Sequence, residues 1–427
     1  ARLYEAVKAI SDFAISLGIN VPTGKDSLSM KQKYGDEEVI APGTVIISAA
    51  ANCSDITKVV EPVFQNGAGS IYYINISRDA YELGGSSFAQ ILNRIGEKAP
   101  TIKESDYVIN VFNTFQDLIK AEQIVAGHDV SSGGLITTLL EMCFADVNLG
   151  ATLNLSALGE KDTVKLLFAE NSGLVFQSKD DSVEVKLKKA GVDFKKIGEV
   201  VQQANLNLKN QEVELSLNID SLRDVWYKTS YLLDNEQTSN NLAKSRYENY
   251  KKQPLFFNFP QDYQNHHPER STEKELRPKA AILREKGSNS EREMANAMYL
   301  AGFDVKDVHM TDLIAGRETL EDIQFIGAVG GFSNSDVLGS AKGWAGAFKY
   351  NEKARQSLLN FFERKDTLSV GICNGCQLFM ELELVNPEHD VHGKMTFNDS
   401  HKHESSFTSV EIEPNDSVML SSLSGTT

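Results

Sequence analysis

Apolar and polar positions alternate along this chain in two long blocks, and each block predicts strands and helices in turn. In the first block, apolar strands at 70–76 and 174–177 alternate with helical stretches at 88–96 and 135–144. In the second block, strands and helices follow one another at 279–283, 290–301, 305–310, 325–329, 341–360 and 368–372. Alternation of this kind is typical of a parallel sheet covered by helices. The pattern predicts a multidomain protein of the α/β and α+β classes.

Four segments follow from the pattern and from local composition. Residues 1–54 read as a helix, a loop with Gly and Pro, and an apolar strand at 43–51, which we interpret as the end of a domain. Residues 55–220 predict an α/β domain, 221–277 a linker, and 278–427 a second α/β domain. Several domains are expected because 427 residues exceed what one core supports. The chain begins inside an apparent helix, so we expect a piece of a longer polypeptide.

Composition narrows the class of protein. A hydrophobic share of 41%, a charged share of 24% and no long apolar run predict a cytoplasmic protein without a membrane span. A net charge of -16 without a Lys/Arg block argues against nucleic acid as a partner. Four cysteines cannot build a disulfide framework for a chain of this length, which favours a reducing compartment.

One cysteine stands at the predicted turn from the strand near 367–372 into the next helix, in the stretch GICNGCQ. Glycines relieve crowding at such a turn, and the following helix amino terminus favours a thiolate and offers N–H groups to an oxyanion. We therefore interpret Cys373 as a nucleophile. Two alternatives remain open. Cys373 and Cys376 are also compatible with a zinc site completed by His401 and His403, or with buried structural cysteines.

Two further stretches carry candidate phosphate chemistry. The stretch HDVSSGGL at 128–135 opens a predicted helix, where small residues let backbone N–H groups approach phosphate and where Asp129 offers an oxygen ligand to Mg²⁺. An Asp/Ser helix cap without any ligand explains the same residues. The stretch GKDSLSM at 24–30 contains Lys25, and a solvated turn accounts for it equally well.

The glycine and glutamine spacing around Cys373 resembles the nucleophile turn of class I glutamine amidotransferases. Its form Cys-Asn-Gly-Cys-Gln is typical of the phosphoribosylformylglycinamidine synthase family. The stretch GGFSNSDVLG at 330–339 resembles the oxyanion loop of that family, with Asn-Ser in place of the usual Tyr-Gly. The resemblance implies that the N–H groups of Gly331 and Asn374 hold the oxyanion, and that Gln377 helps to seat the substrate glutamine.

A nucleophilic cysteine needs a base that a carboxylate orients. Glutaminases of this class take both from a His-x-Glu motif well after the cysteine. The candidate HKHE at 401–404 comes too early, and we interpret it as non-catalytic. We therefore expect the catalytic His and Glu to lie beyond Thr427 and this fragment alone to be inactive.

The first block carries its own resemblance. HDVSSGGL resembles a motif of the aminoimidazole ribonucleotide synthetase-like ATPase superfamily, which implies that Asp129 binds Mg²⁺ and Ser131 contacts ATP. GKDSLSM resembles a segment in the later synthetase repeat of the long single-chain synthases, which implies phosphate contacts for Lys25 and Ser27. The turn GGSS at 84–87 matches that family too, in a packing or phosphate-proximal role.

The order of these motifs implies a synthetase-like carboxyl-terminal α/β domain followed by a truncated, flavodoxin-like class I glutaminase domain. The implied enzyme is a ligase that forms a C–N bond. With ATP, Mg²⁺ and glutamine it converts formylglycinamide ribonucleotide to formylglycinamidine ribonucleotide in purine biosynthesis, and the rest of the parent polypeptide is its partner. Two alternatives remain: another Cys-dependent amidotransferase or hydrolase of the same fold, and a non-catalytic assembly fragment.

Overall fold

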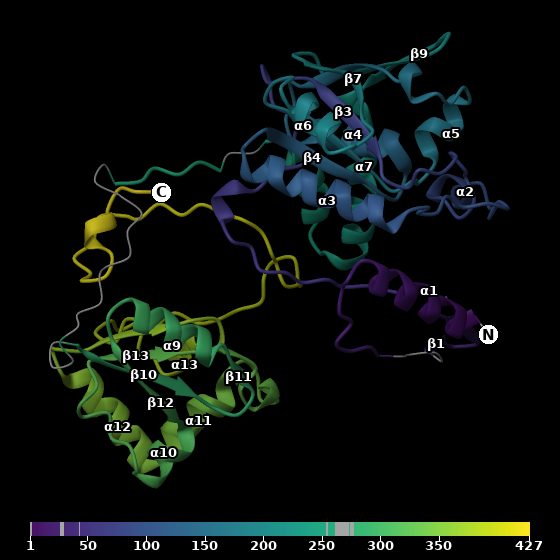
Figure 1. Cartoon of the computed structure of the whole chain (residues 1–427). Coiled ribbons are helices and arrows are strands. Elements are labelled where there is room, and N and C mark those ends of the chain that lie inside the picture. The colour runs from purple at the N-terminus through teal and green to yellow at the C-terminus, as the bar shows by residue number, and fades with distance from the viewer. Residues whose placement is uncertain (1, 26–29, 42, 253–254, 261–272, 274–276) are drawn as a thin grey trace. The chain divides into compact units, whose positions relative to one another are not determined.

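The computed structural model describes residues 2–25, 30–41, 43–252, 255–260, 273 and 277–427 (Figure 1). It contains two compact units. The first comprises residues 1–236 and 243–251, and the second comprises residues 237–242 and 252–427. Among the described residues, every helix is too short or too polar to cross a bilayer.

The amino-terminal segment contains one helix and one hairpin. Helix α1 (Arg2–Ser16) precedes strand β1 (Lys31–Tyr34), which pairs antiparallel with β2 (Glu37–Ile40). The strand predicted at 43–51 is wrong, because the described residues of this stretch are exposed and adopt no regular structure. A strand is stable only when a neighbouring strand pairs with its N–H and C=O groups, and no described strand does so here.

A seven-stranded sheet forms the centre of the first unit. Its spatial order is β4-β6-β3-β7-β5-β8-β9, and all neighbours are antiparallel except β5 and β8. The strands are β3 (Ile71–Asn75), β4 (Ile124–Val130), β5 (Gly150–Asn154), β6 (Gly173–Ser178), β7 (Lys195–Val201), β8 (Asn205–Asn210) and β9 (Val213–Asn218).

Helices cover both faces of this sheet because side chains alternate along its strands. In β3, Tyr72 and Ile74 join the core under α3 (Ser105–Lys120) and α6 (Val183–Lys189). On the other face, Ile71 and Tyr73 join the core under α4 (Gly134–Phe144) and α5 (Thr163–Phe168). Shorter elements are η1 (Ile56–Lys58), α2 (Ser87–Ile91) and η2 (Ser156–Leu158).

The predicted linker at 221–277 lies partly in helices that belong to the first unit. Helix α7 (Ile219–Gln237) packs on it through Trp226, whose Nε1 donates to Glu141 Oε1 at 3.1 Å. Arg223, 1% exposed, donates to the Asp146 carbonyl oxygen at 3.4 Å. Helix α8 (Leu242–Asn249) stacks on α7 through Tyr231 and other tyrosines.

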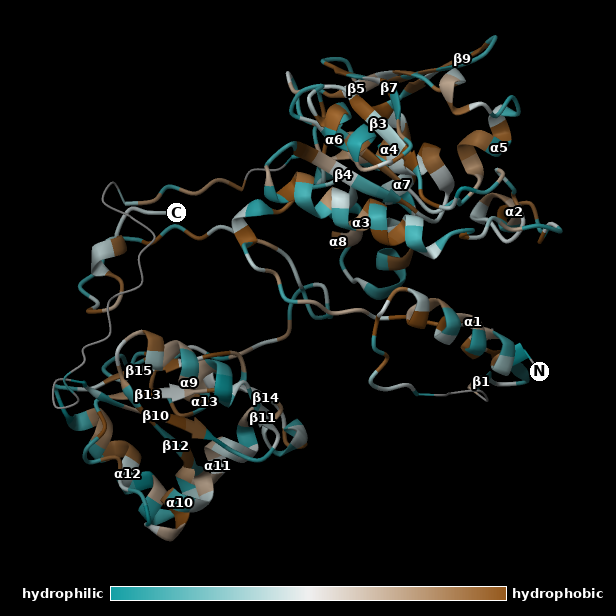
Figure 2. Ribbon diagram, in the orientation of Figure 1, coloured by the Kyte–Doolittle hydropathy of each residue, from teal (hydrophilic) through white to brown (hydrophobic). Residues whose placement is uncertain are grey.

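The second unit has the predicted parallel sheet, in the order β12-β10-β13-β15. Its strands are β10 (Lys279–Arg284), β12 (Asp304–His309), β13 (Phe325–Ala328) and β15 (Leu368–Gly371), with a small ladder of β11 (Ser288–Asn289) and β14 (Gly330–Gly331). The helices are α9 (Glu291–Leu300), α10 (Met310–Ala315), α11 (Lys342–Tyr350), α12 (Glu352–Glu363) and α13 (Asn374–Glu381), with η4 (Ser333–Asp336) and η5 (Ser421–Leu423). Figure 2 shows the central strand β10 as largely hydrophobic and the helices as mixed, as amphipathic packing requires.

Two boundaries differ from the prediction. The helix expected at 341–360 is two helices, because Asn351 has a non-helical backbone (φ -111°, ψ 118°) and its side chain caps α12 by accepting from the Ala354 N–H at 3.0 Å. The helix after the nucleophile turn, which the sequence pattern predicts from about Leu378, begins at Asn374 and so starts directly behind Cys373.

Candidate active site

Cys373 occupies the sharp turn between β15 and α13. Its backbone has φ 52° and ψ -110°, a conformation that costs a non-glycine residue about 1–3 kcal/mol and is found mainly at functional sites. Hydrogen bonds of the flanking backbone fix the turn, from the Ile372 N–H to the Ala328 carbonyl at 3.0 Å and from the Gln377 N–H to the Cys373 carbonyl at 3.1 Å. The residue is exposed, so its thiol is accessible to a substrate.

The glycines on either side of Cys373 permit a close approach of backbone to backbone. A Cβ on Gly371 would lie 2.6 Å from the Gly375 carbonyl oxygen, and one on Gly375 would lie 2.0 Å from the Ala328 carbonyl oxygen. Real Cβ atoms do not tolerate such distances. The start of α13 therefore rests directly on the ends of β13 and β15, and this contact explains the glycine spacing.

The predicted oxyanion loop lies against the nucleophile. A Cβ on Gly330 would lie 3.3 Å from Cys373 Cβ and 3.9 Å from Cys373 Sγ. Next to it, Gly331 faces Ser288 of β11, and the Phe332 N–H beside this pair donates to the Gly287 carbonyl at 2.8 Å. That bond makes Ser288 and Gly331 a non-hydrogen-bonded pair, so the Gly331 N–H points away from β11. It is thus available to another acceptor.

Asn374 connects this loop to the nucleophile turn. Its side chain is 0% exposed, and its Oδ1 accepts from the Ser333 N–H at 3.1 Å. Its Nδ2 lies 3.3 Å from Asp336 Oδ1 and 3.0 Å from Gln377 Oε1. The structure thereby brings together the loop that carries Gly331 and three of the predicted site residues, Cys373, Asn374 and Gln377.

The loop has a left-handed backbone at the two positions where Asn-Ser replaces the usual Tyr-Gly and at the residue that follows them. Asn334, Ser335 and Asp336 have φ of 53°, 57° and 50°. Left-handed backbone of this kind costs most non-glycine residues about 1–2 kcal/mol each, with Asn and Asp the better tolerated. The family's glycine therefore matches the conformation at Ser335, and here serine adopts it at a cost.

A base for Cys373 is not found among the described residues, where no side chain hydrogen-bonds its thiol. His309 ends β12, three strands from β15, and sheet spacing separates these strands by about 14 Å. Its Nδ1 instead accepts from the Thr311 N–H at 3.2 Å and caps α10. The catalytic His and Glu thus stay a prediction.

The zinc alternative gains no support. In the part of the chain that the structure describes, no three His, Cys, Asp or Glu side chains come together as metal ligands. The described side chains do not form such a group for magnesium either. Asp129 is exposed at the end of β4 and supplies one oxygen ligand, which alone does not make a site.

The HDVSSGGL stretch joins β4 to α4. Asp129 and the exposed Ser131 lie on either side of the point where β4 ends. Gly133 and Gly134 follow with φ of 89° and 73°, and a Cβ on Gly133 would lie 2.3 Å from Thr137 Oγ1. Only glycine fits this turn, which explains the Gly-Gly pair without reference to a ligand.

His128 links Asp129 to the helices of the same unit. Its Nδ1 lies 3.3 Å from Asp129 Oδ1, and its Nε2 lies 3.4 Å from Glu141 Oε2 on α4. Glu141 also accepts from Trp226 of α7. The shorter contact of His128 Nδ1, at 2.7 Å, is with the Asp129 carbonyl oxygen, so this chain of contacts to α7 holds the backbone at Asp129 and approaches its exposed carboxylate at 3.3 Å.

Glu170 accepts hydrogen bonds from two backbone N–H groups, one of them in the HDVSSGGL stretch. Its Oε1 accepts from the Gly133 N–H at 2.8 Å and from the Ser87 N–H at 2.7 Å. This carboxylate joins the GGSS turn at 84–87 to the HDVSSGGL stretch. The Gly133 N–H is consequently engaged within the protein. No sequence motif identified Glu170 as a residue of this site, because a single Glu after a short helix has no distinctive spacing.

The two other predicted phosphate contacts lie near the amino terminus. Lys25 is exposed between α1 and β1. Ser27 lies outside the described residues.

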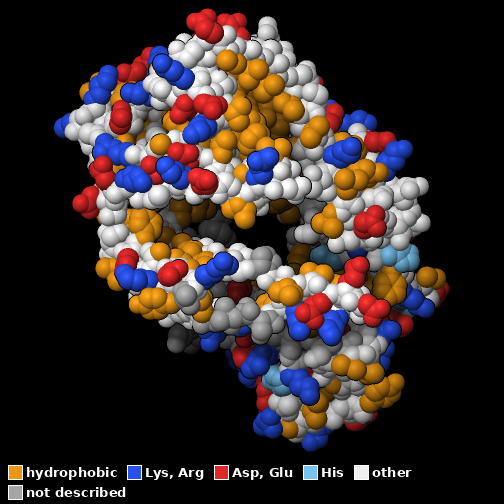
Figure 3. Space-filling view, turned by 90° about the vertical axis from the view of Figure 1, so that its right-hand side faces the viewer, with side chains coloured by type: hydrophobic (Ala, Val, Ile, Leu, Met, Phe, Trp, Pro, Cys, Tyr) orange, Lys and Arg blue, Asp and Glu red, His pale blue; other side chains and the backbone are white. Residues whose placement is uncertain are grey.

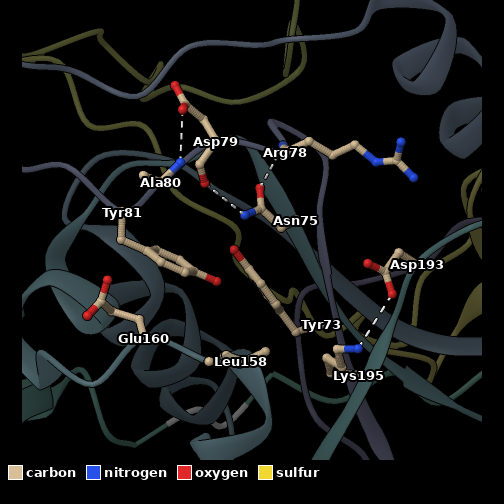
Figure 4. A pocket seen from close by; sticks show the side chains of 11 residues that line it. Tyr73, Asn75, Arg78, Asp79, Ala80, Tyr81, Leu158, Glu160, Asp193 and Lys195 are labelled. Atoms are coloured by element: carbon tan, nitrogen blue, oxygen red, sulfur yellow. Dashed lines mark hydrogen bonds and ion pairs between the residues drawn. The ribbon is translucent and has the colours of Figure 1, made fainter.

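The first unit also contains a pocket of about 550 Å³ (Figure 4). Tyr73 and Tyr81 point their hydroxyl groups toward each other inside it, and burial raises the pKa of both. Its cations have carboxylate partners, at 3.1 Å between Arg78 and Glu104 and at 3.5 Å between Lys195 and Asp193. None of the predicted site residues is among the residues that line it. A second, mainly apolar groove of about 490 Å³ includes Asp129 in its lining.

On the face that Figure 3 displays, acidic and basic side chains are interspersed and do not gather by sign. Such a distribution offers no basic stripe to a phosphate backbone.

Comparison with known families matches three consecutive parts of the chain. Residues 1–52 match the FGAR-AT PurM_N-like domain, and residues 77–209 match the AIR synthase related protein, C-terminal domain. Residues 277–427 match the CobB/CobQ-like glutamine amidotransferase domain.

Curated relatives match over the whole chain. The probable phosphoribosylformylglycinamidine synthase, chloroplastic/mitochondrial, of Arabidopsis thaliana is 39% identical over 445 residues, which cover 100% of this chain and 31% of that protein. The phosphoribosylformylglycinamidine synthase of Homo sapiens is 36% identical over 459 residues, with coverage of 100% and 33%. The chain thus spans about a third of the length of these relatives.

A solved structure, Thermotoga maritima PurL complexed with FGAR, resembles 50% of this chain and 36% of its own, with 14% identity and a TM-score of 0.37. This likeness is too distant to bear on the site.

Proposed function

We propose that the chain is part of a protein of the phosphoribosylformylglycinamidine synthase family, in which it forms the glutaminase site and part of the synthetase. The complete protein would convert formylglycinamide ribonucleotide, ATP, glutamine and water to formylglycinamidine ribonucleotide, ADP, phosphate and glutamate. This reaction is a step of purine biosynthesis. The cytoplasmic location stays a prediction, since one relative is named chloroplastic/mitochondrial.

The observation that carries the glutaminase half is the exposed, strained Cys373 beside the oxyanion loop. Its Sγ attacks the side-chain amide carbon of glutamine, and the carbonyl oxygen becomes an oxyanion that accepts from the N–H groups of Gly331 and Asn374. When the C–N bond breaks, the nitrogen takes the proton that the Cys373 thiol gave up and leaves as ammonia. Water then hydrolyses the glutamyl thioester to glutamate and frees the thiol. Gln377 helps to seat the substrate.

In the synthetase half, ATP phosphorylates the amide oxygen of the substrate, and ammonia displaces the phosphate. We assign Ser131, Lys25 and Ser27 to contacts with ATP or its phosphates, and Asp129 to one ligand of Mg²⁺. The metal ion would offset phosphate charge when bound. The contacts from Asp129 through His128 to Glu141 support a fixed position for the backbone that carries that carboxylate. A protected path must carry the ammonia, because bulk water would protonate it.

Labelling of Cys373 tests the glutaminase assignment. A glutamine-analogue electrophile is expected to modify Cys373 in the full-length enzyme that contains this chain, and excess glutamine is expected to slow the modification. Cys373→Ser is the negative control, and exposed Cys53 reports unspecific alkylation. Modification of Cys373 that glutamine does not slow would favour the alternative, another Cys-dependent hydrolase of this fold.

The proposal for the base has its own test. Glutamine hydrolysis by residues 1–427 should be far slower than by a version extended at its carboxyl end, because the extension would supply the His and Glu. Equal rates in the two would refute the assignment of the base beyond Thr427.

A further inference from the structure

The buried side chain of Asn374 makes three polar contacts that leave no atom of its amide unused. Oδ1 accepts from the backbone of Ser333, while Nδ2 faces acceptor oxygens of Asp336 and Gln377 at 3.3 and 3.0 Å. Two of these partners belong to the oxyanion loop, about 40 residues earlier in the chain. An amide is needed, because only a group with an acceptor and a donor on one carbon satisfies both sides.

The backbone conformation of the loop that Asn374 contacts is energetically unfavourable. Three consecutive non-glycine residues, 334–336, have positive φ. Strained backbone persists only where surrounding contacts over-determine it. The loop also carries Gly331, whose N–H must point at the oxyanion and is left free by the β11 ladder. A contact that fixes the loop at Ser333 and Asp336 therefore fixes the direction of this donor.

We propose that the Asn374 side chain is a positioning residue, which fastens the oxyanion loop to the nucleophile turn so that the Gly331 N–H meets the developing oxyanion. The inference deepens the proposed glutaminase function and rests on it. The backbone N–H of Asn374 acts on the oxyanion directly, whereas its side chain acts through the loop. One residue thus couples both donors of the oxyanion hole.

The effect of a misplaced donor on the kinetics depends on the stage of the reaction at which the oxyanion forms. Its charge develops in the transition state, so a misplaced donor lowers kcat and leaves glutamine binding nearly unchanged. Loss of one oxyanion donor lowers kcat by about 10²–10³-fold in enzymes of this kind. Because the donor here is displaced and not removed, we expect a fall in kcat of at least about 10-fold. KM should stay within about threefold in a variant that leaves Gln377 undisturbed, whereas a change at Asn374 also alters its contact with Gln377.

The test uses Asn374→Asp in the full-length enzyme, with glutamine hydrolysis as the readout. The substitution keeps the shape but puts an acceptor oxygen against Asp336 and Gln377. Asn360→Asp, the same change at an exposed position of α12, is the matched control and should leave kcat unchanged. In the double variant Asn374→Asp with Asp336→Asn, donor and acceptor exchange places between these two residues. Recovery of kcat should be partial, because the Ala341 N–H loses the Asp336 Oδ1 to which it donates at 3.3 Å.

Asp336→Ala supplies a second measurement should Asn374→Asp fail to fold, since it releases the loop from the other end and should lower kcat in the same way. A kcat within twofold of wild type for a folded Asn374→Asp or Asp336→Ala enzyme would overturn the proposal. A loss of kcat that the double exchange leaves unreversed would overturn it too. A wild-type enzyme without glutaminase activity would refute the proposed function instead.

Discussion

Gly330→Ala is expected to shield the Cys373 thiol without unfolding the protein. The new methyl carbon would lie 3.3 Å from Cys373 Cβ, 3.6 Å from the Ile372 carbonyl oxygen and 3.9 Å from Cys373 Sγ. Gly330 does not have a positive φ, so alanine fits its backbone. A contact of 3.3 Å requires shifts of only a few tenths of an ångström. We therefore expect the free energy of unfolding to change by no more than about 1–2 kcal/mol.

The rate of thiol modification should change far more. A methyl group in van der Waals contact with Sγ excludes an incoming carbon from the side that faces the oxyanion loop. If this raises the barrier to attack by about 1.4 kcal/mol, alkylation slows about tenfold.

The assay is alkylation of the native chain by iodoacetamide, with each cysteine followed by peptide mass spectrometry. Exposed Cys53 is an internal reference in every sample. Cys143 is the unreactive standard, because burial raises the pKa of its thiol to about 12. Thermal unfolding of the same samples checks that the variant is folded. A folded Gly330→Ala chain whose Cys373 is alkylated as fast as in wild type, relative to Cys53, would refute the stated geometry of the thiol.

Three other predictions concern stability and are measured by denaturant or thermal unfolding. Gly375→Ala should destabilise the second unit by on the order of 3 kcal/mol or more, since its Cβ would lie 2.0 Å from the Ala328 carbonyl oxygen; an unchanged midpoint would contradict the close packing of α13 on the sheet. Glu170→Ala should cost about 1–2 kcal/mol and Glu170→Gln less, because the amide oxygen still accepts from the two N–H groups; equal losses would argue against the shared acceptor. The hydrogen bond from Lys196 holds the pKa of Asp181 below its usual value, as do those from Tyr72 and Ser70. This stabilisation is present above the unfolded-state pKa near 4 and is lost as pH falls through the lowered folded-state pKa. Asp181→Asn should therefore flatten the stability profile below about pH 4, and an unaltered slope would exclude the ion pair as its source.

The sequence by itself determined those elements that depend only on residues near one another in the chain. The alternation after Pro278 predicted the parallel sheet of the second unit, because amphipathic periodicity reflects which face of each element is buried. The glycines around Cys373 identified a strand-to-helix turn, and those of HDVSSGGL identified another, because positive φ and close backbone approach restrict the residue type at a single position. The family resemblance rested on the same short stretches.

The family resemblance implied that the loop at 330–339 lies beside Cys373, but the contacts by which distant stretches meet were decided only by the tertiary structure. Gly330 touches the thiol because β13 lies beside β15, and local periodicity does not encode strand order. The contacts of Asn374 with Ser333 and Asp336, and the carboxylate of Glu170 between two backbone N–H groups, likewise join residues about 40 or more positions apart. The stretch 43–51 shows that a local pattern can also predict an element that does not form. Its apolar residues predicted a strand, yet strand formation depends on a hydrogen-bonding neighbour that no local pattern supplies.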